Sequence, residues 1–525
     1  MTLPRSAWRV LLHLLALALM TAPLATRADP ADIDAAARGV VRIIIIDRRG
    51  GQPVAVSHGT GFAVGPERIV TNAHVVAQAQ ANQDLAIGIV PSDGGDAIYA
   101  RLIAISARND LALLATTAPM RLPPLTISGN PTVDAGAVTA VGYPMNVDRA
   151  QGLSAGDIFR ATPPVKSTGS LSGRRPSRDF DSLLHTAPIA RGNSGGPLLD
   201  ECGRVIGVNS FGAESGSADA EFFFAVSTRE LLPFLTANEV SPQINSLPCR
   251  SLAELDAAEE QRAERARLQA EQRAVADAAT LARQREDARR GIEFAIIAGR
   301  ENGMAIAFLL VIGACGAGLY GLFLREFPRE GSEDAPARGP KVAFIVAGLL
   351  VVGAGAAWLL RPGFGSVEDR LDEALDRTAA ATPGGAEAGG AGDYICVLDA
   401  DRSRVTGGAV EDVQLGWAQD GCVNGRTQYG QAGGRWARVL VPDDEAAVTV
   451  NRFDPATREY RVDRYLLGRD ALAAIRQARG AYDPPQCGGD AAAALELGQH
   501  QQAITALLPA QPNERLVYSC RKSGE

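Results

Sequence analysis

The fold is decided by three short segments of this chain, Thr71-Asn72-Ala73-His74-Val75-Val76, Arg108-Asn109-Asp110-Leu111-Ala112-Leu113-Leu114 and Arg191-Gly192-Asn193-Ser194-Gly195-Gly196-Pro197. Acyl transfer to a side-chain oxygen needs a hydroxyl nucleophile, an imidazole that takes its proton and a carboxylate that holds the imidazole. The three segments supply one of each, as Ser194, His74 and Asp110. We therefore predict that these side chains, distant in the sequence, meet at one groove.

Glycines flank Ser194 closely on both sides. They allow a tight turn that residues with a side chain would strain. Such a turn aims the backbone N–H groups of Gly192 and Ser194 at one point, which predicts an oxyanion hole. A serine in a glycine-rich surface turn is the alternative interpretation, because short motifs also match by chance.

His74 and Asp110 each follow or precede a predicted strand. His74 comes after a strand that ends at Thr71, so we expect it at the strand end or in the turn after it. Asp110 stands at the edge of an apolar run, where an unpaired carboxylate would be costly. The Nδ1–H of His74 would pair with it and leave Nε2 free to act as a base. The alternatives are a histidine packed among apolar neighbours and an aspartate that caps a turn.

Length and composition limit the possible domain organisation and partners of the chain. The chain has 525 residues, too many for one core, and its 46% apolar and 21% charged residues are typical of folded protein. A net charge of −8 without a basic cluster argues against a nucleic-acid partner. Residues 1–28 combine Arg5 and Arg9 with an apolar run and small residues, which predicts a cleaved signal peptide. An uncleaved anchor is the alternative.

Two later stretches, 303–324 and 342–360, contain no charged residue. Each approaches the ~20 residues that a spanning helix requires, which predicts two transmembrane helices in a lipid bilayer. Buried core helices are the alternative. An exported N-terminal part makes residues 325–341 a short cytoplasmic loop, and it puts both large flanks outside the cytoplasm.

The cysteines agree with this topology, because even numbers of them fall on the two exported flanks. Two precede the first span and four follow the second, in the order Cys202, Cys249, Cys396, Cys422, Cys487 and Cys520. Even counts favour disulfide pairing in an oxidising compartment. We expect a Cys202–Cys249 bond, while the last four cysteines permit three connectivities that the sequence does not distinguish.

The remaining chain divides by composition. Residues 33–248 consist of short apolar runs between turn residues, which favours an all-β barrel or sandwich arrangement. Residues 251–300 are rich in Ala, Glu, Arg and Gln and predict a charged helical spacer. Residues 378–392 read as a flexible linker. Residues 393–525 predict a small α+β domain stapled by disulfides, without a recognisable chemical motif.

The region 40–234 resembles the trypsin-like (chymotrypsin-fold) serine proteases, most closely the bacterial HtrA/Deg type. The segments that carry the likeness are those of His74, Asp110 and Ser194 together with Gly59-Thr60-Gly61-Phe62, Val141-Gly142-Tyr143-Pro144 and Val205-Ile206-Gly207-Val208-Asn209. The resemblance implies two six-stranded β-barrels with the triad in the cleft between them. It also implies peptide-bond hydrolysis through an acyl-enzyme.

The chain departs from that family in two respects. No PDZ domain is recognisable after the protease-like region, so sensing of peptide ends and regulated oligomerisation do not carry over. Pro188 stands where trypsin would carry its specificity carboxylate, which argues against cleavage after Lys or Arg. By the same resemblance, Ser210-Phe211-Gly212 is the strand that pairs with the substrate backbone. We expect an apolar first pocket that prefers small or medium aliphatic residues.

The sequence therefore predicts a multidomain, membrane-anchored serine endopeptidase that acts on polypeptides. His74 would be the general base, Asp110 would orient it, Ser194 would be the nucleophile, and no metal or cofactor would be needed. We expect the bacterial inner (cell) membrane, with the protease and C-terminal domains on the periplasmic side. A non-catalytic envelope protein that binds or senses ligands with a protease-like fold is the alternative. The oligomeric state is unknown from the sequence.

Overall fold

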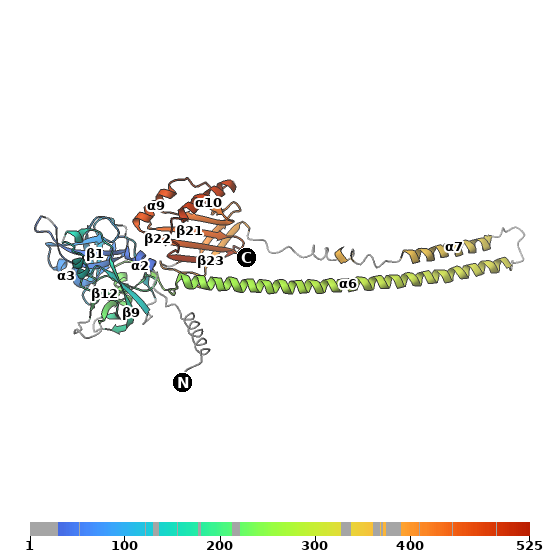
Figure 1. The fold of residues 1–525 in the computed structure, drawn as a ribbon, viewed down its shortest axis with the longest axis horizontal. Helices are drawn as coiled ribbons and strands as arrows, with labels where there is room; N and C mark the ends of the chain where they lie inside the picture. The colour runs from blue at the N-terminus through green and yellow to red at the C-terminus, as the bar shows by residue number, and fades with distance from the viewer. Residues whose placement is uncertain are drawn as a thin grey trace, which may run out of the picture. The chain divides into compact units, whose positions relative to one another are not determined.

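The computed structural model describes residues 30–51, 53–120, 122–129, 136–154, 156–176, 180–212, 221–326, 338–360, 368, 371–373, 390–408, 410–443, 445–489 and 491–524. The chain divides into two compact units, one of Met1–Glu259 with Glu387–Glu525 and one of Glu260–Ala386 (Figure 1). The predicted signal peptide, and most of the predicted cytoplasmic loop and linker, lie outside the described residues.

The first barrel of the first unit is closed and has six strands. Its order is β1-β2-β3-β6-β5-β4, with antiparallel neighbours. The strands are β1 (Val40–Asp47), β2 (Val54–Gly65), β3 (Arg68–Thr71), β4 (Leu85–Pro91), β5 (Ile98–Ser106) and β6 (Leu111–Thr116). Apolar side chains from both faces of β1 are buried, since Ile43 and Ile45 pack in one core cluster and Ile44 in another. Burial on both faces explains why β1 reads as an unbroken apolar run rather than an alternating one.

The second barrel also contains six strands in a ring. Its order is β11-β8-β9-β10-β13-β12, and a β11–β12 pairing closes it. The strands are β8 (Gly136–Gly142), β9 (Val165–Pro176), β10 (Asp181–His185), β11 (Pro197–Leu199), β12 (Val205–Gly212) and β13 (Phe223–Ser227). The short strands β7 (Ile127–Ser128) and β14 (Ile244–Asn245) extend the sheet beyond β12. The double β-barrel that the resemblance implied is therefore confirmed.

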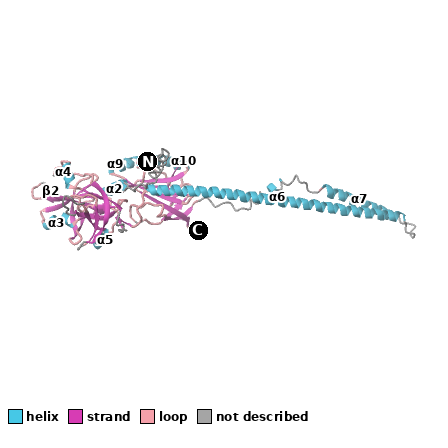
Figure 2. Ribbon diagram, turned by 60° about the horizontal axis from the view of Figure 1, so that its bottom comes forward, coloured by secondary structure: helices cyan, strands magenta, loops and turns pink. Residues whose placement is uncertain are grey.

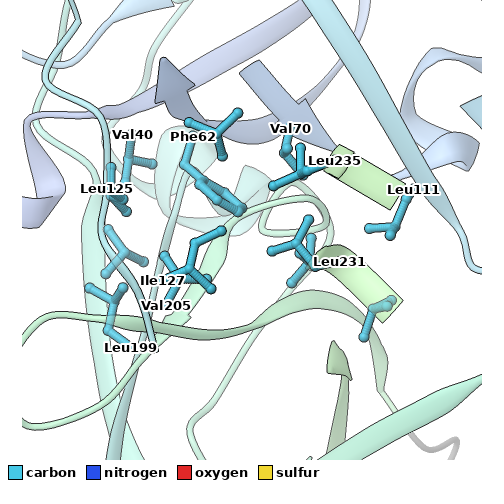
Figure 3. Close-up of a cluster of buried hydrophobic side chains, with 14 of the residues drawn as sticks. Val40, Phe62, Val70, Leu111, Leu125, Ile127, Leu199, Val205, Leu231 and Leu235 are labelled. Atoms are coloured by element: carbon cyan, nitrogen blue, oxygen red, sulfur yellow. The ribbon is translucent and has the colours of Figure 1, made fainter. Parts of the chain in front are cut away.

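A shared apolar core joins the two barrels. It combines Phe62 and Val70 of the first barrel with Val205 of the second and with Leu231 and Leu235 of α5 (Thr228–Ala237) (Figure 3). All five side chains are fully shielded from solvent. Burial of this kind contributes about 1.5–3 kcal/mol for each large aliphatic or aromatic side chain. This core fixes the two barrels against each other, and groups carried by different barrels consequently keep a defined spacing.

The C-terminal part of the first unit is a nine-stranded antiparallel sheet. Its order is β18-β17-β16-β15-β23-β22-β21-β20-β19. The strands are β15 (Gly392–Leu398), β16 (Val413–Trp417), β17 (Cys422–Val423), β18 (Thr427–Gln428), β19 (Gly430–Ala432), β20 (Arg435–Leu440), β21 (Ala447–Asp454), β22 (Glu459–Leu466) and β23 (Glu514–Lys522). Helices α9 (Arg469–Arg479) and α10 (Ala491–Thr505) share a core with Val448 and Val450 of β21. Phe453 lies in a separate, aromatic core, as the alternation of a strand requires.

Three disulfides stabilise the first unit. Cys202 is bonded to Cys249 in the double-barrel region. Cys396 of β15 is bonded to its register partner Cys520 of β23, and Cys422 is bonded to Cys487. The structure thereby selects one of the three connectivities that the sequence left open for the last four cysteines. The remaining cysteine, Cys315, is free and exposed.

The described residues of the second unit are almost entirely helical (Figure 2). Helix α6 (Leu252–Glu326) is continuous, so the predicted spacer and first span are one helix rather than two elements. Helix α7 (Arg338–Leu359) packs against it, with Gly321 facing Ala343 and Gly313 facing Leu350. Both helices contain a stretch long and apolar enough to cross a membrane.

Candidate active site

His74 lies in the first turn of a helix rather than at a strand end. Helix α3 (Ala73–Ala81) starts directly after Asn72. The expectation that His74 lies at the strand end or in the turn after it was therefore wrong, because His74 is the second residue of the helix that follows the strand. The Nδ2–H of Asn72 donates to the backbone oxygen of Asp110 at 2.8 Å. This bond ties the start of the helix to the start of β6, and it brings the imidazole and the carboxylate onto the same edge of the first barrel.

The Asp110 carboxylate holds His74 at two points. The backbone N–H of His74 donates to Oδ1 at 3.1 Å, and Nδ1 lies 2.9 Å from Oδ2 and 3.0 Å from Oδ1. The first N–H groups of a helix have no partner within it and favour a negative charge nearby, which explains the backbone bond. With Nδ1–H directed at the carboxylate, Nε2 is left as the basic nitrogen. Asp110 itself adopts a left-handed backbone with φ 51°.

Ser194 lies in the loop before β11 of the second barrel, against residues that precede His74. The backbone oxygen of Ser194 accepts a hydrogen bond from the N–H of Thr60 at 2.9 Å. The next residue, Gly195, has φ +85°, and a Cβ there would lie 2.2 Å from Thr71 Oγ1 and 2.9 Å from the backbone nitrogen of Asn72. Only glycine permits this approach, which places the serine turn beside the start of α3.

Ser210 connects the serine with the carboxylate. The Ser194 hydroxyl donates to the backbone oxygen of Ser210 at 3.0 Å, and the Ser210 hydroxyl donates to Asp110 Oδ2 at 2.5 Å. The three predicted side chains thus belong to one hydrogen-bonded set that runs from Ser194 through Ser210 and Asp110 to His74. In this geometry the Ser194 hydroxyl donates to the Ser210 backbone oxygen rather than to the imidazole.

In the turn before Ser194, the backbone oxygens of Arg191 and Gly192 both accept hydrogen bonds from residues outside the turn. The Arg191 oxygen accepts from the N–H of Met145 at 2.7 Å, and the Gly192 oxygen accepts from Thr60 Oγ1 at 2.6 Å. A trans peptide directs its N–H and C=O to opposite sides. Because the Arg191 carbonyl points to Met145, the N–H of Gly192 points away from Met145.

The residues expected to bind substrate lie at the edge of the second barrel. Pro188 is exposed, as are Phe211 and Gly212 at the end of β12. The Phe211 ring is 47% exposed and stacks on Phe224 of β13 with 4.9 Å between ring centroids. Residues 213–220 lie outside the described part of the chain. The apolar first pocket and its preference for aliphatic residues stay predictions.

Several side chains that hold this site do not stand out in the sequence. Thr60 was recognised only as part of a motif, and Ser210 only as a substrate contact. His58 and Asp148, which lie behind the Gly192 turn, were not singled out, although His58 precedes that motif directly. Glu230 of α5 was also missed; it accepts from the side chain of Asn109 at 2.8 Å and thereby supports the residue before Asp110.

A buried histidine of the second barrel, His185 of β10, has no part in this set. Burial lowers its pKa to about 4, so it is neutral at ordinary pH. Within the described residues, no group of three or more His, Cys, Asp or Glu side chains is arranged to hold a metal ion.

Comparison with known proteins identifies this part of the chain. The family model described as "Trypsin-like peptidase domain" matches residues 59–208, which include all three of these side chains. The chain contains a match to a trypsin-like peptidase domain and is similar to HtrA-type serine proteases. It is 32% identical over 211 residues to the mitochondrial serine protease HTRA2 of Bos taurus, and this match covers 39% of the chain and 42% of that protein.

Two further proteins are similar to part of the chain. A serine protease of Mycobacterium tuberculosis is 32% identical over 195 residues, 36% of this chain and 42% of its own length. A solved structure of an HtrA-type protease with a tripeptide matches with a TM-score of 0.31 and 22% identity, over 40% of this chain and 62% of that one. The chain spans about two-fifths of the length of the bovine and the mycobacterial protease.

Proposed function

We propose that this protein is a membrane-anchored serine endopeptidase that cleaves polypeptides on the outer side of a bacterial inner membrane. Ser194 is the nucleophile, His74 is the general base and then the general acid, and Asp110 holds His74. The N–H groups of Gly192 and Ser194 receive the oxyanion. Its role is the processing or quality control of envelope proteins.

One observation carries the proposal: Asp110 contacts both His74 and Ser210, while the backbone oxygen of Ser210 accepts the hydroxyl of Ser194. Two barrels with a common core contribute these groups, and their hydrogen bonds join them across the sequence. The HtrA-type relatives support the same reaction class.

The reaction follows from these atoms. Ser194 Oγ attacks the carbonyl carbon of the scissile bond while its proton passes to His74 Nε2. The carbonyl electron pair moves onto the oxygen, which the two backbone N–H groups stabilise. His74 then gives the proton to the leaving amine, and an acyl-enzyme remains. Water, deprotonated by His74, hydrolyses this ester and restores the serine.

The anchoring part of the proposal depends on α6 and α7. Their apolar stretches have a mean hydropathy of 2.2 and 2.4, and few of their residues are buried. A pair of helices that exposes so many apolar side chains suits lipid better than water. The disulfides of both flanks fit an oxidising compartment outside the cytoplasm.

A fluorophosphonate probe tests the catalytic part. The probe is expected to label the full-length protein in detergent, and Ser194→Ala is expected to abolish labelling. Ser172→Ala, which removes an exposed serine of β9, is the matched control and should label normally. Absence of labelling in the wild-type protein together with retained peptide binding would favour the non-catalytic binding protein instead.

Proteolysis of intact spheroplasts tests the anchoring part. External proteinase K is expected to degrade both the peptidase domain and the C-terminal domain, detected by antibodies to each, while the protein resists extraction with alkaline carbonate. Protection of either domain until the cells are lysed would contradict the proposed topology.

A further inference from the structure

A buried charged cluster lies directly behind the proposed oxyanion hole. It consists of Arg42 from β1, His58 from β2 and Asp148 from α4 (Met145–Ala150), with side chains that are 2%, 6% and 13% exposed. Arg42 Nη2 donates to Asp148 Oδ1 at 2.9 Å, and His58 Nε2 lies 3.2 Å from Asp148 Oδ2. Buried charges of this kind are costly unless they are paired, so this cluster calls for an explanation.

We propose that Arg42, His58 and Asp148 are positioning residues for the oxyanion hole, acting through the backbone of Tyr143 to Met145. The inference rests on the proposed function and names how its oxyanion hole is held. It assigns no group of the cluster to contact with substrate.

The first link runs from the cluster to Tyr143. His58 Nε2 lies 3.1 Å from the Tyr143 backbone oxygen, at hydrogen-bond distance. The Arg42 guanidinium lies 4.7 Å from the centre of the Tyr143 ring, and the Tyr143 hydroxyl donates to the Thr162 oxygen at 3.1 Å. The backbone oxygen and the hydroxyl of Tyr143 are therefore both held by hydrogen-bond partners.

The second link runs from Tyr143 and its neighbours to the serine turn. The Tyr143 N–H donates to Thr60 Oγ1 at 3.0 Å, and that hydroxyl donates to the Gly192 oxygen. Met145 N–H holds the Arg191 oxygen. The hydrogen bonds to the Arg191 and Gly192 oxygens fix the peptide groups on either side of Gly192. The position of the backbone of 143–145 therefore determines the direction of the Gly192 N–H.

The third link is a direct contact between the cluster and Gly192. A Cβ at this glycine would lie 3.1 Å from His58 Nε2 and 2.2 Å from the Tyr143 oxygen. His58 thus forms part of the wall against which the turn rests. Burial and the nearby Arg42 both lower the pKa of His58, while Asp148 raises it, so His58 stays neutral at neutral pH and offers one N–H donor.

His58→Phe tests the inference, because phenylalanine fills a similar volume but cannot donate to the Tyr143 oxygen. We expect kcat for a peptide p-nitroanilide with valine before the scissile bond to fall about tenfold or more, with KM within about twofold, since removal of a whole oxyanion donor costs about 10²–10³. His58→Gln restores a side-chain N–H and should recover most of the loss. Arg204→Met, which breaks the buried Arg204–Asp200 pair of the same domain, is the control and should keep kcat.

A pair of inhibitors separates positioning from general damage. Ser194 Oγ adds to the carbon of a peptidyl aldehyde, the C=O electron pair becomes the oxyanion, and the proton passes to His74. The matching peptidyl alcohol binds without this bond. His58→Phe should weaken the aldehyde about tenfold or more and the alcohol about twofold or less. An unchanged ratio of the two affinities would overturn the inference.

Two further variants keep the test decisive. If His58→Phe does not fold, Asp148→Asn removes the charge that faces His58 and Arg42 and should lower the same ratio. If Ser194→Ala fails to abolish hydrolysis, the proposed function falls and this inference with it. Loss of hydrolysis in Ser194→Ala together with unchanged kcat in both His58→Phe and Asp148→Asn would overturn the inference alone.

Discussion

The Ser210 hydroxyl donates to Asp110 Oδ2 at 2.5 Å, while the backbone oxygen of Ser210 accepts the hydroxyl of Ser194 at 3.0 Å. One residue of β12 in the second barrel therefore contacts both the Asp110 carboxylate of the first barrel and Ser194, the proposed nucleophile. The arrangement ties the end of β12, where substrate is expected to pair, to the proposed catalytic groups.

Two substitutions at this contact should differ strongly in effect. Asp110→Asn is expected to lower kcat by about 10⁴, because the amide favours the wrong tautomer of His74. Ser210→Ala removes one hydroxyl donor but keeps the backbone oxygen, so a loss of about tenfold is expected. Steady-state hydrolysis of the valine p-nitroanilide measures both. Equal losses in the two variants would show that Ser210 matters as much as the carboxylate.

The burial of His185 predicts how the free energy of unfolding depends on pH. Burial lowers its pKa from 6.5 to about 4 in the folded protein. The unfolded chain therefore binds the proton first, and acidification from pH 6.5 towards 4 favours unfolding, by about 3 kcal/mol from this group. His185→Gln should flatten the dependence of the unfolding free energy on pH by that amount over this range.

Urea titrations of the full-length protein in detergent at several pH values provide the measurement. His500→Gln, which removes a histidine whose side chain is 44% exposed, serves as the control. A pH slope in His185→Gln as steep as that of the wild type would contradict the assignment of the lost stability to His185.

A buried ion pair makes a prediction for the first unit. Arg404 donates to Asp32 of α2 (Pro30–Ala37), and both side chains are 2% exposed. Asn513 Nδ2 also donates to Asp32 Oδ1, at 3.0 Å. Arg404→Met leaves the carboxylate buried without its cation and should lower the free energy of unfolding by about 3–5 kcal/mol. Fluorescence of Trp417 and Trp436 reports the unfolding.

A surface pair supplies the matched control. Arg250 and Asp401 lie 2.9 Å apart with side chains 36% and 80% exposed, so Arg250→Met should change stability by less than about 1 kcal/mol. The double variant Asp32→Leu with Arg404→Met should be more stable than Arg404→Met alone, since no charge is then stranded. A double variant as unstable as the single one would contradict this account.

Short apolar runs between turn residues predicted the all-β arrangement of residues 33–248, which the two barrels confirm. The strand expected to end at Thr71 is β3. Tertiary contacts explain what was missed. Helix α3 begins where the carboxylate of Asp110, far away in sequence, accepts a hydrogen bond from the backbone N–H of His74. In α6, the single glycines at 291 and 303 do not interrupt the helix.

The three candidate catalytic residues stand out in the sequence because each has a distinctive local context, whereas the residues that support them do not. Arg42 interrupts an apolar run and Asp148 lies in an ordinary polar segment. Arg42 lies in the first barrel and Asp148 in α4, between β8 and β9 of the second, so the packing of the two barrels brings these residues, 106 apart in sequence, into contact. A charged residue inside an otherwise apolar strand was the one available signal, since such a residue needs a buried partner.

Gly192→Ala tests how the turn before Ser194, which is proposed to supply an oxyanion donor, is packed. Gly152→Ala is its control. Both glycines have a left-handed backbone, with φ +101° and +71°, but only the Cβ at 192 would collide, lying 2.2 Å from the Tyr143 oxygen. Gly152→Ala therefore carries the backbone strain alone, about 1–2 kcal/mol, and should keep kcat. Gly192→Ala must also displace the peptide that supplies an oxyanion donor, so kcat should fall about 10²-fold or more. The rate of hydrolysis and the thermal unfolding of both variants separate the effect on kcat from the effect on stability. If Gly192→Ala loses as much stability as Gly152→Ala yet keeps kcat, the Gly192 N–H does not face the oxyanion.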